Sequence, residues 1–287
     1  MSVHRKAILV ISSHVIRGSV GSRSSVFVFE QFGFPVWQMI TISLTWQPDH
    51  GRSHRLIVSD QDFAAWAADI ATSPWGDEIG TVLTGYFGNA SQVGISADLI
   101  KALKAKNPEL VYYCDPIIGD DKGLYVDEKI AIEIREKLLP LADIIKPNRA
   151  ELEWLVGRTL NDNKMIVEAI GELGAQKALV TSSYAFLKNK TANLFMDSKN
   201  IWLAEHRLIS NPVSGLGDLT GALFYSRLLH GEDIENALRH ATSSVQHVLN
   251  NTLRYGADEL MLTFDRRDLL NPTAPVDIRH MQIKDLK

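Results

Sequence analysis

The chain has 287 residues, 45% of them apolar, so it is long enough to bury a full hydrophobic core as one large domain. Its net charge of −4 and its pI near 6.1 argue against a surface built for nucleic acid or acidic membranes. The single cysteine, Cys114, excludes an internal disulfide, and no apolar run has the length of a signal peptide core or a membrane span. We therefore expect a soluble, cytoplasmic protein.

Short apolar runs alternate along the chain with longer stretches of helical periodicity. The predicted strands are Ala7–Ser12, Val36–Leu44, Thr81–Thr84, Leu110–Cys114, Ile144–Ile145, Ala178–Thr181, Ala192–Met196 and Ile201–His206. The predicted helices are Ser24–Phe32, Asp60–Ala71, Gln92–Lys106, Glu128–Leu138, Glu151–Val156, Lys164–Leu173 and Asp233–Leu253. This alternation predicts an α/β fold with a mostly parallel central sheet and helices on both faces, a three-layer α/β/α sandwich.

The end of the chain departs from this alternation. The last two predicted strands are joined by Asp197–Asn200, which is typical of a hairpin late in the sheet. The tail after Asn271 contains Pro272 and Pro275 and few apolar residues, so we expect it to be a surface extension. Because no repeat, low-complexity tract or linker interrupts the pattern, residues 1–287 are expected to form a single domain.

Polar or glycine-rich residues follow most of the predicted parallel strands. In chain order these are Ser13-His14, Gly85-Tyr86, Asp115-Pro116, Lys146-Pro-Asn148 and Thr181-Ser182. Ligands of parallel sheets bind outside the carboxyl ends of the strands. The convergence of these residues at one edge therefore predicts a ligand site there.

The most informative motif is Gly215-Leu-Gly-Asp218, a glycine turn that leads directly into an apolar helical pattern. Backbone N–H groups at a helix start favour an anion, and the glycines leave room for it. Asp218 would lie in the first helical turn, where the helix dipole favours its ionised form and where it could act as a general base. The alternative is an ordinary glycine-rich loop with an acidic residue near a helix N-terminus. The Walker and Rossmann glycine patterns are absent, so the motif favours a phosphotransferase of another type.

Two further segments carry carboxylates suited to Mg²⁺ bound to a nucleotide. Asp115 and Asp120 flank a turn after a buried strand, and Glu151 lies in a helix start after Asn148. The alternatives are a surface turn for the aspartates and a capping box formed by Asn148 and Glu151. The histidines lack zinc-site spacing, and no Gly-x-Ser-x-Gly elbow indicates a serine hydrolase.

Over most of its length the chain resembles the pyridoxal kinases of the ribokinase-like superfamily. The segments that carry the resemblance are Ser13–Arg23, Leu83–Tyr86, Tyr113–Asp120, Leu141–Asn148 with Glu151, Val180–Ser183 and Gly215–Asp218. The resemblance implies a ribokinase-like fold and an ATP-dependent kinase that phosphorylates the 5′-hydroxymethyl group of pyridoxal. It also implies a homodimer, and it leaves open whether pyridoxine and pyridoxamine are substrates too.

The same resemblance implies roles for individual residues. Asp218 would accept the proton of the hydroxymethyl group, while the N–H groups of Gly215, Leu216 and Gly217 would stabilise the transferring phosphoryl group. The remaining implied roles are contacts to the vitamin by Ser13 and Tyr86, contacts to ATP by Asp115, Asn148, Glu151, Thr181, Ser182 and Gly217, and binding of Mg²⁺ by Asp115, Asp120 and Glu151. A requirement for K⁺ is left open.

Two positions depart from the pattern of that family. After the second strand, the Ser-Asn-His-Thr-like segment of the family is replaced by Thr45-Trp-Gln-Pro-Asp49, in which Pro48 has neither an N–H nor a hydroxyl group. We expect Trp46 to cover the pyridine ring by stacking instead. Lys146 replaces a smaller residue and would add charge near the phosphates. These departures leave open a hydroxymethylpyrimidine or a sugar alcohol as the acceptor, or a non-catalytic vitamin-binding relative.

Overall fold

The structure is a computed structural model that describes residues 5–210, 212–264 and 266–282. A ten-stranded sheet runs through it in the order β12-β11-β10-β9-β8-β5-β4-β1-β2-β3. The strands of this sheet are β1 (Ala7–Arg17), β2 (Val36–Trp46), β3 (Arg55–Ile57), β4 (Ile79–Thr84), β5 (Val111–Cys114), β8 (Ile144–Ile145), β9 (Ala178–Ser183), β10 (Lys190–Met196), β11 (Ile201–Arg207) and β12 (Asp277–Met281). A separate small hairpin is formed by β6 (Gly119–Asp120) and β7 (Gly123–Leu124).

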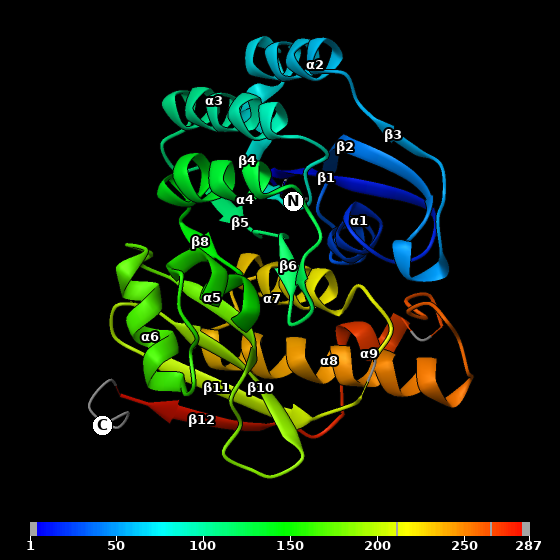
Figure 1. Ribbon diagram of the computed structural model, residues 1–287, viewed down its shortest axis with the longest axis vertical. Helices are drawn as coiled ribbons and strands as arrows, with labels where there is room; N and C mark the ends of the chain where they lie inside the picture. Colours follow the sequence, from blue (N-terminus) through cyan, green and yellow to red (C-terminus); the bar gives the residue numbers. More distant parts are fainter. Residues whose placement is uncertain (1–4, 211, 265, 283–287) are drawn as a thin grey trace.

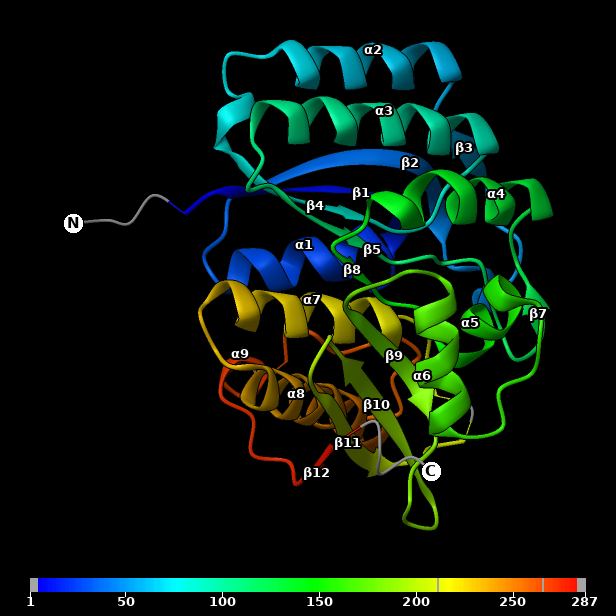
Figure 2. The same cartoon turned by 90° about the vertical axis from the view of Figure 1, so that its left-hand side faces the viewer.

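Helices cover both faces of the sheet (Figures 1 and 2). One face is covered by α1 (Ser22–Gln31), α7 (Leu216–Leu229), α8 (Ile234–Arg254) and α9 (Arg266–Leu270). The other is covered by α2 (Asp60–Thr72), α3 (Ala90–Lys106), α4 (Glu128–Glu133), α5 (Arg149–Val156) and α6 (Asn163–Glu172). Each face has its own cluster of buried apolar side chains, so the predicted three-layer α/β/α sandwich is confirmed.

Side-chain caps explain where several helices begin. Ser59, Asn89, Asp162 and Asp233 each accept a hydrogen bond from the backbone N–H three residues further on, at the starts of α2, α3, α6 and α8. Such caps satisfy N–H groups that have no partner within the helix. Among the described residues, no helix is both long enough and apolar enough to cross a membrane.

The centre of the sheet is parallel and its margins are antiparallel. β2, β1, β4, β5, β8 and β9 are parallel neighbours in space. β3 pairs antiparallel with β2, and the predicted late hairpin is present as β10 and β11. The carboxyl ends of six strands therefore lie along one edge of the sheet, where a ligand site is expected.

The first strand continues beyond its predicted end at Ser12. β1 runs to Arg17 and stays paired with β2 past a register shift between Ser12 and His14, whereas its pairing with β4 ends at Ile11. Ser13 and His14 therefore belong to a projecting arm of the strand and do not follow it. The sequence does not predict this arm, because Ser12, Ser13 and His14 interrupt the apolar run. A strand that pairs with only one neighbour does not need a continuous apolar run.

The expectation of a surface extension after Asn271 is wrong for its central part. Asp277–Met281 forms β12, which pairs antiparallel with β11 at the edge of the sheet, and Met281 is buried. The sequence does not predict this strand, because ion pairs, and not an apolar run, contribute much of its contact with the sheet. Arg279 places its Nε 2.7 Å from Oε1 of Glu205, a fully buried side chain of β11. The sequence also does not predict the short elements β3, β6, β7 and α9.

We expect replacement of Arg279 by alanine to destabilise the protein, because it leaves the buried carboxylate of Glu205 without its cation. The free energy of unfolding should fall by about 1–3 kcal/mol, the range for a buried polar group that loses its partner. Thermal and urea unfolding of Arg279→Ala would measure this, with Arg207→Ala, an exposed arginine of β11, as the matched control. Equal stability of the two variants would contradict a structural role for β12.

Candidate active site

The polar residues that follow the parallel strands meet at the carboxyl edge of the sheet. Asp115 follows β5 and Lys146 follows β8, and Lys146 Nζ lies 2.9 Å from Asp115 Oδ2. The backbones of Asn148 and Thr181 pair as an isolated parallel bridge beyond β8 and within β9. The segments at Asp115, at Lys146–Asn148 and at Thr181 therefore converge as predicted, although Thr181 and Ser182 lie within β9 and do not follow it.

The turn at Gly215 allows two distant segments to approach each other closely. Gly215 is the N-cap of α7, with φ of +95°, and a Cβ atom there would stand 2.4 Å from the carbonyl oxygen of Ser19. Only glycine tolerates both conditions without strain. The first N–H groups of α7, including those of Leu216 and Gly217, have no partner within the helix and carry a partial positive charge. The predicted anion-binding turn thus has the geometry that such a site needs.

Asp218 lies in the first turn of α7, as predicted, and is held there by the loop before α1. The N–H of Gly21 donates to Asp218 Oδ2 at 2.9 Å. Gly21 in turn packs on Ser13, because a Cβ atom at Gly21 would stand 2.4 Å from Ser13 Oγ. Ser13, Gly21 and Asp218 therefore form one corner of the site.

Burial raises the pKa of Asp218, against the opposing effects of the Gly21 N–H and of Lys146. The expected effect of the helix dipole, which favours the ionised form of Asp218, is thus outweighed by burial, which favours the neutral form. The fold also half-buries Asp218 near the carboxylate of Asp115, and the loss of solvation is the larger effect. A raised pKa makes Asp218 a stronger base.

Lys146 is buried among the carboxylates of Asp115, Glu151 and Asp218. Burial alone would lower the pKa of Lys146, but the charges of Asp115 and Glu151 outweigh it and raise this pKa. Burial raises the pKa of Asp115, and the neighbouring ammonium group of Lys146 opposes that effect. The sequence placed Lys146 near the phosphates but could not identify its partner.

Glu151 holds two segments of the site together. Its Oε2 accepts from the Asn148 N–H at 2.7 Å, and the Asn148 side chain accepts from the Glu151 N–H at 2.9 Å, so the capping box is present. Its Oε1 accepts from the Ile118 N–H at 3.1 Å, which fixes the loop after Asp115. Burial and repulsion by Asp115 raise the pKa of Glu151.

Among the three carboxylates expected to bind Mg²⁺, Asp115 has an oxygen without a hydrogen-bond partner in the described part of the chain. Its Oδ1 is buried and has no hydrogen-bond partner among the described residues, while its Oδ2 contacts Lys146. Asp120 Oδ1 accepts from the Lys122 N–H at 2.8 Å, and both oxygens of Glu151 accept backbone N–H groups. In the described ranges no three His, Cys, Asp or Glu side chains gather in a way that could hold a metal ion. One free carboxylate oxygen nevertheless suits Mg²⁺, which keeps most of its ligands from water and phosphate.

Two of the residues expected to contact the vitamin, Tyr86 and Trp46, lie on one face of the β1–β2 arm. The Thr41 hydroxyl donates to the Tyr86 carbonyl oxygen at 2.7 Å, and the Tyr86 side chain packs against Ile42 and Leu44. Side chains alternate along a strand, so Trp46 lies on the same face of β2 as Ile42 and Leu44. Trp46 is the last residue of β2 and not part of the loop that follows.

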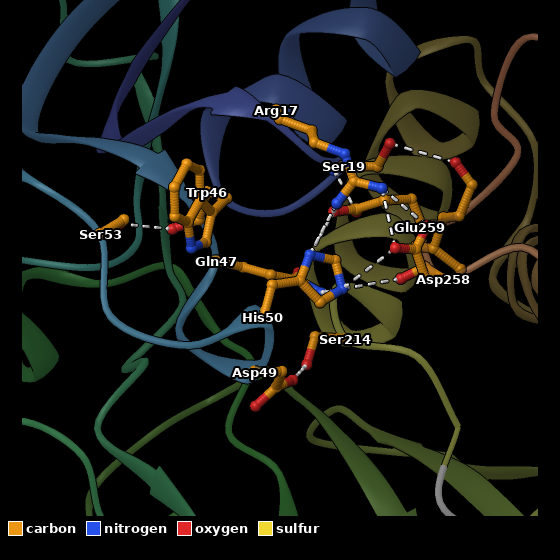
Figure 3. A network of polar contacts seen from close by, with 11 residues as sticks. Arg17, Ser19, Trp46, Gln47, Asp49, His50, Ser53, Ser214, Asp258 and Glu259 are labelled. Atoms are coloured by element: carbon orange, nitrogen blue, oxygen red, sulfur yellow. Dashed lines mark hydrogen bonds and ion pairs between the residues drawn. The ribbon is translucent and has the colours of Figure 1, made fainter.

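The segment after β2 is anchored to Ser214, the residue before the turn at Gly215 (Figure 3). Pro48–His50 form one turn of 3-10 helix, and Pro48 stands at its start, where a missing N–H costs nothing. Asp49 accepts a hydrogen bond from the Ser214 hydroxyl, directly before Gly215. This contact joins the segment that departs from the family pattern to the turn that begins α7.

Beside this segment lies a network of charged side chains that the sequence does not predict. His50 Nδ1 lies 2.8 Å from Arg17 and 3.3 Å from Glu259 Oε1, and Arg17 binds both carboxylate oxygens of Asp258 at 2.8 Å (Figure 3). The hydrogen bonds to Asp258 raise the pKa of Arg17 and lower that of Asp258. Since these residues come from three distant parts of the chain, no local pattern indicates that they meet.

Two further residues, Ser182 and Tyr125, have a backbone conformation or a shifted pKa that is typical of functional sites. Ser182 has an exposed side chain and a φ of +58°, a left-handed backbone conformation that is uncommon for serine and found disproportionately at functional sites. Tyr125 follows β7 and is 49% exposed, and partial burial of its hydroxyl, together with the carboxylates of Glu151 and Asp218, raises its pKa. Tyr125 therefore lies close to the carboxylates of Glu151 and Asp218, a position that no local sequence pattern indicates.

Comparison with known proteins places this geometry in a family. The sequence model of the family described as phosphomethylpyrimidine kinase matches residues 28–262. The chain is 32% identical over 281 residues to pyridoxal kinase PdxY of Rubrobacter xylanophilus, which covers 96% of this chain and 97% of that protein. It is also 32% identical over 277 residues to pyridoxal kinase PdxY of Granulibacter bethesdensis, covering 93% and 96% of the two chains.

A solved structure agrees with these sequence matches. The crystal structure of pyridoxal kinase from Entamoeba histolytica superposes with a TM-score of 0.89 at 25% identity, over 96% of this chain and all of that one (100%). Fold, sequence and family model thus agree along nearly the whole chain. The chain belongs to the phosphomethylpyrimidine kinase family and, within it, to the pyridoxal kinases of the ribokinase-like superfamily.

Proposed function

We propose that this protein transfers the γ-phosphoryl group of ATP to the 5′-hydroxymethyl group of pyridoxal, forming pyridoxal 5′-phosphate and ADP in the salvage of vitamin B6. The observation that carries the proposal is the start of α7, where N–H groups that have no partner within the helix lie beside the carboxylate of Asp218. An anion site and a base within one helical turn are what a phosphotransferase to an alcohol needs. Relatives at 32% identity over nearly the full chain carry the name pyridoxal kinase.

In the proposed reaction, the hydroxyl oxygen attacks the γ-phosphorus of ATP. The bond from this phosphorus to the β,γ-bridging oxygen breaks, and its electron pair leaves with ADP. Asp218 accepts the hydroxyl proton, and the Gly21 N–H keeps its carboxylate in place. The N–H groups of Gly215, Leu216 and Gly217 would stabilise the transferring group, because phosphoryl transfer depends mainly on positioning and electrostatics.

Mg²⁺ is proposed to bind with the nucleotide at the Asp115 side of the site. Asp115 Oδ1 would hold it directly or through water, since this oxygen is buried without a partner among the described residues. When bound, the metal neutralises charge on the phosphate oxygens. Asp120 and Glu151 would act through water molecules, because each already accepts backbone hydrogen bonds. The remaining proposed contacts to ATP are those of Asn148, Thr181 and Ser182.

The acceptor is proposed to lie between the β1–β2 arm and Asp218. Ser13 and Tyr86 would contact the pyridine ring, and Trp46 would cover it. The indole Nε1 of Trp46 is buried and has no hydrogen-bond partner in the part of the chain that the structure describes, which leaves a donor for the substrate. Stacking by Trp46 would thus replace the contact that the threonine of the family makes and that Pro48, without a hydroxyl or an N–H group, cannot make.

We further propose that the protein is a cytoplasmic homodimer, as the family resemblance implies. Exposed apolar side chains of β1 and of the edge strand β3, which both pair with β2, support a second copy at this side of the sheet. Ile16 of β1 is 66% exposed, and Leu56 and Ile57 of β3 are 62% and 44% exposed. A partner chain would remove this apolar surface from water.

The acceptor is tested with a panel of alcohols supplied with ATP and Mg²⁺, with phosphorylated product measured by mass spectrometry. The panel consists of pyridoxal, pyridoxine, pyridoxamine, a hydroxymethylpyrimidine and ribose. We expect the highest kcat/KM with pyridoxal, because Trp46 and Tyr86 are proposed to hold a pyridine ring. A clear preference for the pyrimidine or the sugar would contradict the substrate assignment, and no product from any alcohol would contradict the kinase activity.

The role of Asp218 is tested by Asp218→Asn, which keeps the size of the side chain and an oxygen for the Gly21 N–H. We expect kcat to fall by at least about 100-fold, the usual size of a general-base contribution, with the affinity for nucleotide little changed. The matched control is Glu235→Gln, an acidic residue in the first turn of α8. Turnover near the wild-type rate in Asp218→Asn would remove Asp218 from the mechanism.

A further inference from the structure

Lys146 is a buried charged group to which the proposed reaction assigns no task. It is 3% exposed, and its Nζ contacts Asp115. Its aliphatic chain lies against α7, since a Cβ atom on Gly221 would stand 2.7 Å from Lys146 Cδ. Any side chain at Gly221 would collide with the lysine, so this glycine makes room for it.

The end of the same side chain reaches the phosphate-binding turn. A Cβ atom on Gly217 would stand 3.5 Å from Lys146 Nζ. Gly217 and Gly221 are four residues apart and therefore neighbours on one face of the helix. Lys146 thus extends along a face of α7 that bears no side chains, and its ammonium group ends beneath the first turn.

Charge balance explains why a cation is needed at this place. Asp115, Glu151 and Asp218 all act electrostatically on Lys146. ATP would bring several more negative charges to the same corner. Away from bulk water, repulsion between such groups is weakly screened, and one fixed ammonium group offsets it more effectively than it would at the surface.

We propose that Lys146 is a catalytic residue of this site, whose ammonium group contacts the γ-phosphoryl group of bound ATP and stabilises its charge during transfer. The inference rests on the proposed function, in which ATP is the phosphoryl donor. Asp115 then has two tasks, because its Oδ2 orients Lys146 while its Oδ1 remains for Mg²⁺. The site contains a positive charge of its own in addition to the metal.

A purely structural role makes a different prediction. If Lys146 only neutralises Asp115, its loss should lower stability and weaken all nucleotides alike. If it contacts the γ-phosphoryl group, its loss should weaken ATP far more than ADP, which lacks that group. The preference for ATP over ADP therefore separates the two roles.

The test is calorimetric binding of Mg²⁺-ADP and of the Mg²⁺ complex of the β,γ-imido analogue of ATP. In Lys146→Met we expect the affinity for the analogue to fall by about 10-fold or more, the size of one charge-assisted hydrogen bond, and that for ADP to change much less. The matched control is Lys104→Met, because Lys104 also pairs with an aspartate, Asp143, at 2.8 Å but outside the site. Equal losses for both nucleotides, or no loss, would overturn the proposal.

A second pair of variants covers the case in which Lys146→Met does not fold. Asp115→Asn and the double variant Asp115→Asn with Lys146→Met differ only at Lys146, and the double variant leaves no unpaired carboxylate at position 115. The double variant should show the same selective loss for the ATP analogue relative to Asp115→Asn. An unchanged ratio of the two affinities would count against contact with the γ-phosphoryl group.

Turnover supplies an independent readout. We expect methylammonium ions to restore kcat of Lys146→Ala by at least about 10-fold, because they can occupy the space of the missing ammonium group, whereas the larger tetramethylammonium should not. No rescue at concentrations that leave the wild type unaffected would contradict the role in transfer. If the wild type binds the ATP analogue but phosphorylates no pyridoxal, the proposed function fails, while the binding comparison still decides the role of Lys146.

Discussion

The ion pair between Asp115 and Lys146 is the interaction on which the rest of the site depends. Burying two charges costs several kcal/mol for each, so such a pair persists only where the fold holds both partners in place. Here the adjacent parallel strands β5 and β8 do so, and α7 covers the pair with a face that bears no side chains. The same arrangement leaves Asp115 Oδ1 without a partner among the described residues and places the Lys146 ammonium group beside Gly217, in the turn proposed to bind an anion.

A second constraint joins the two halves of the proposed reaction. Because Gly215 has no Cβ atom, the loop after β1 can approach the start of α7, and the Gly21 N–H can then hold Asp218. From the other side, Asp49 binds Ser214 next to the same turn. The segments expected to enclose the vitamin are thus tied to the segment expected to hold the phosphate.

Much of this organisation can be predicted from the sequence. The elements that cannot be predicted depend on contacts that leave no local sequence pattern. Buried parallel strands such as the one that includes residues 7–11 are continuous apolar runs, and the turn at Gly215 is a local glycine pattern. The sequence therefore predicts both. It does not predict β12, because this is an edge strand held partly by charges. Tyr125 and the contact between Arg17 and Asp258, 241 residues apart, depend on tertiary proximity, which no short motif encodes.

The most direct measurement is a crystal structure of the protein with Mg²⁺ and the β,γ-imido analogue of ATP. We expect the terminal phosphate to accept hydrogen bonds from the N–H groups at Gly215–Gly217, with the Lys146 ammonium group in contact and the Asp218 carboxylate facing the open side of the phosphorus. A terminal phosphate bound away from the start of α7 would contradict the anion site, and with it the assignment of Asp218 as the base.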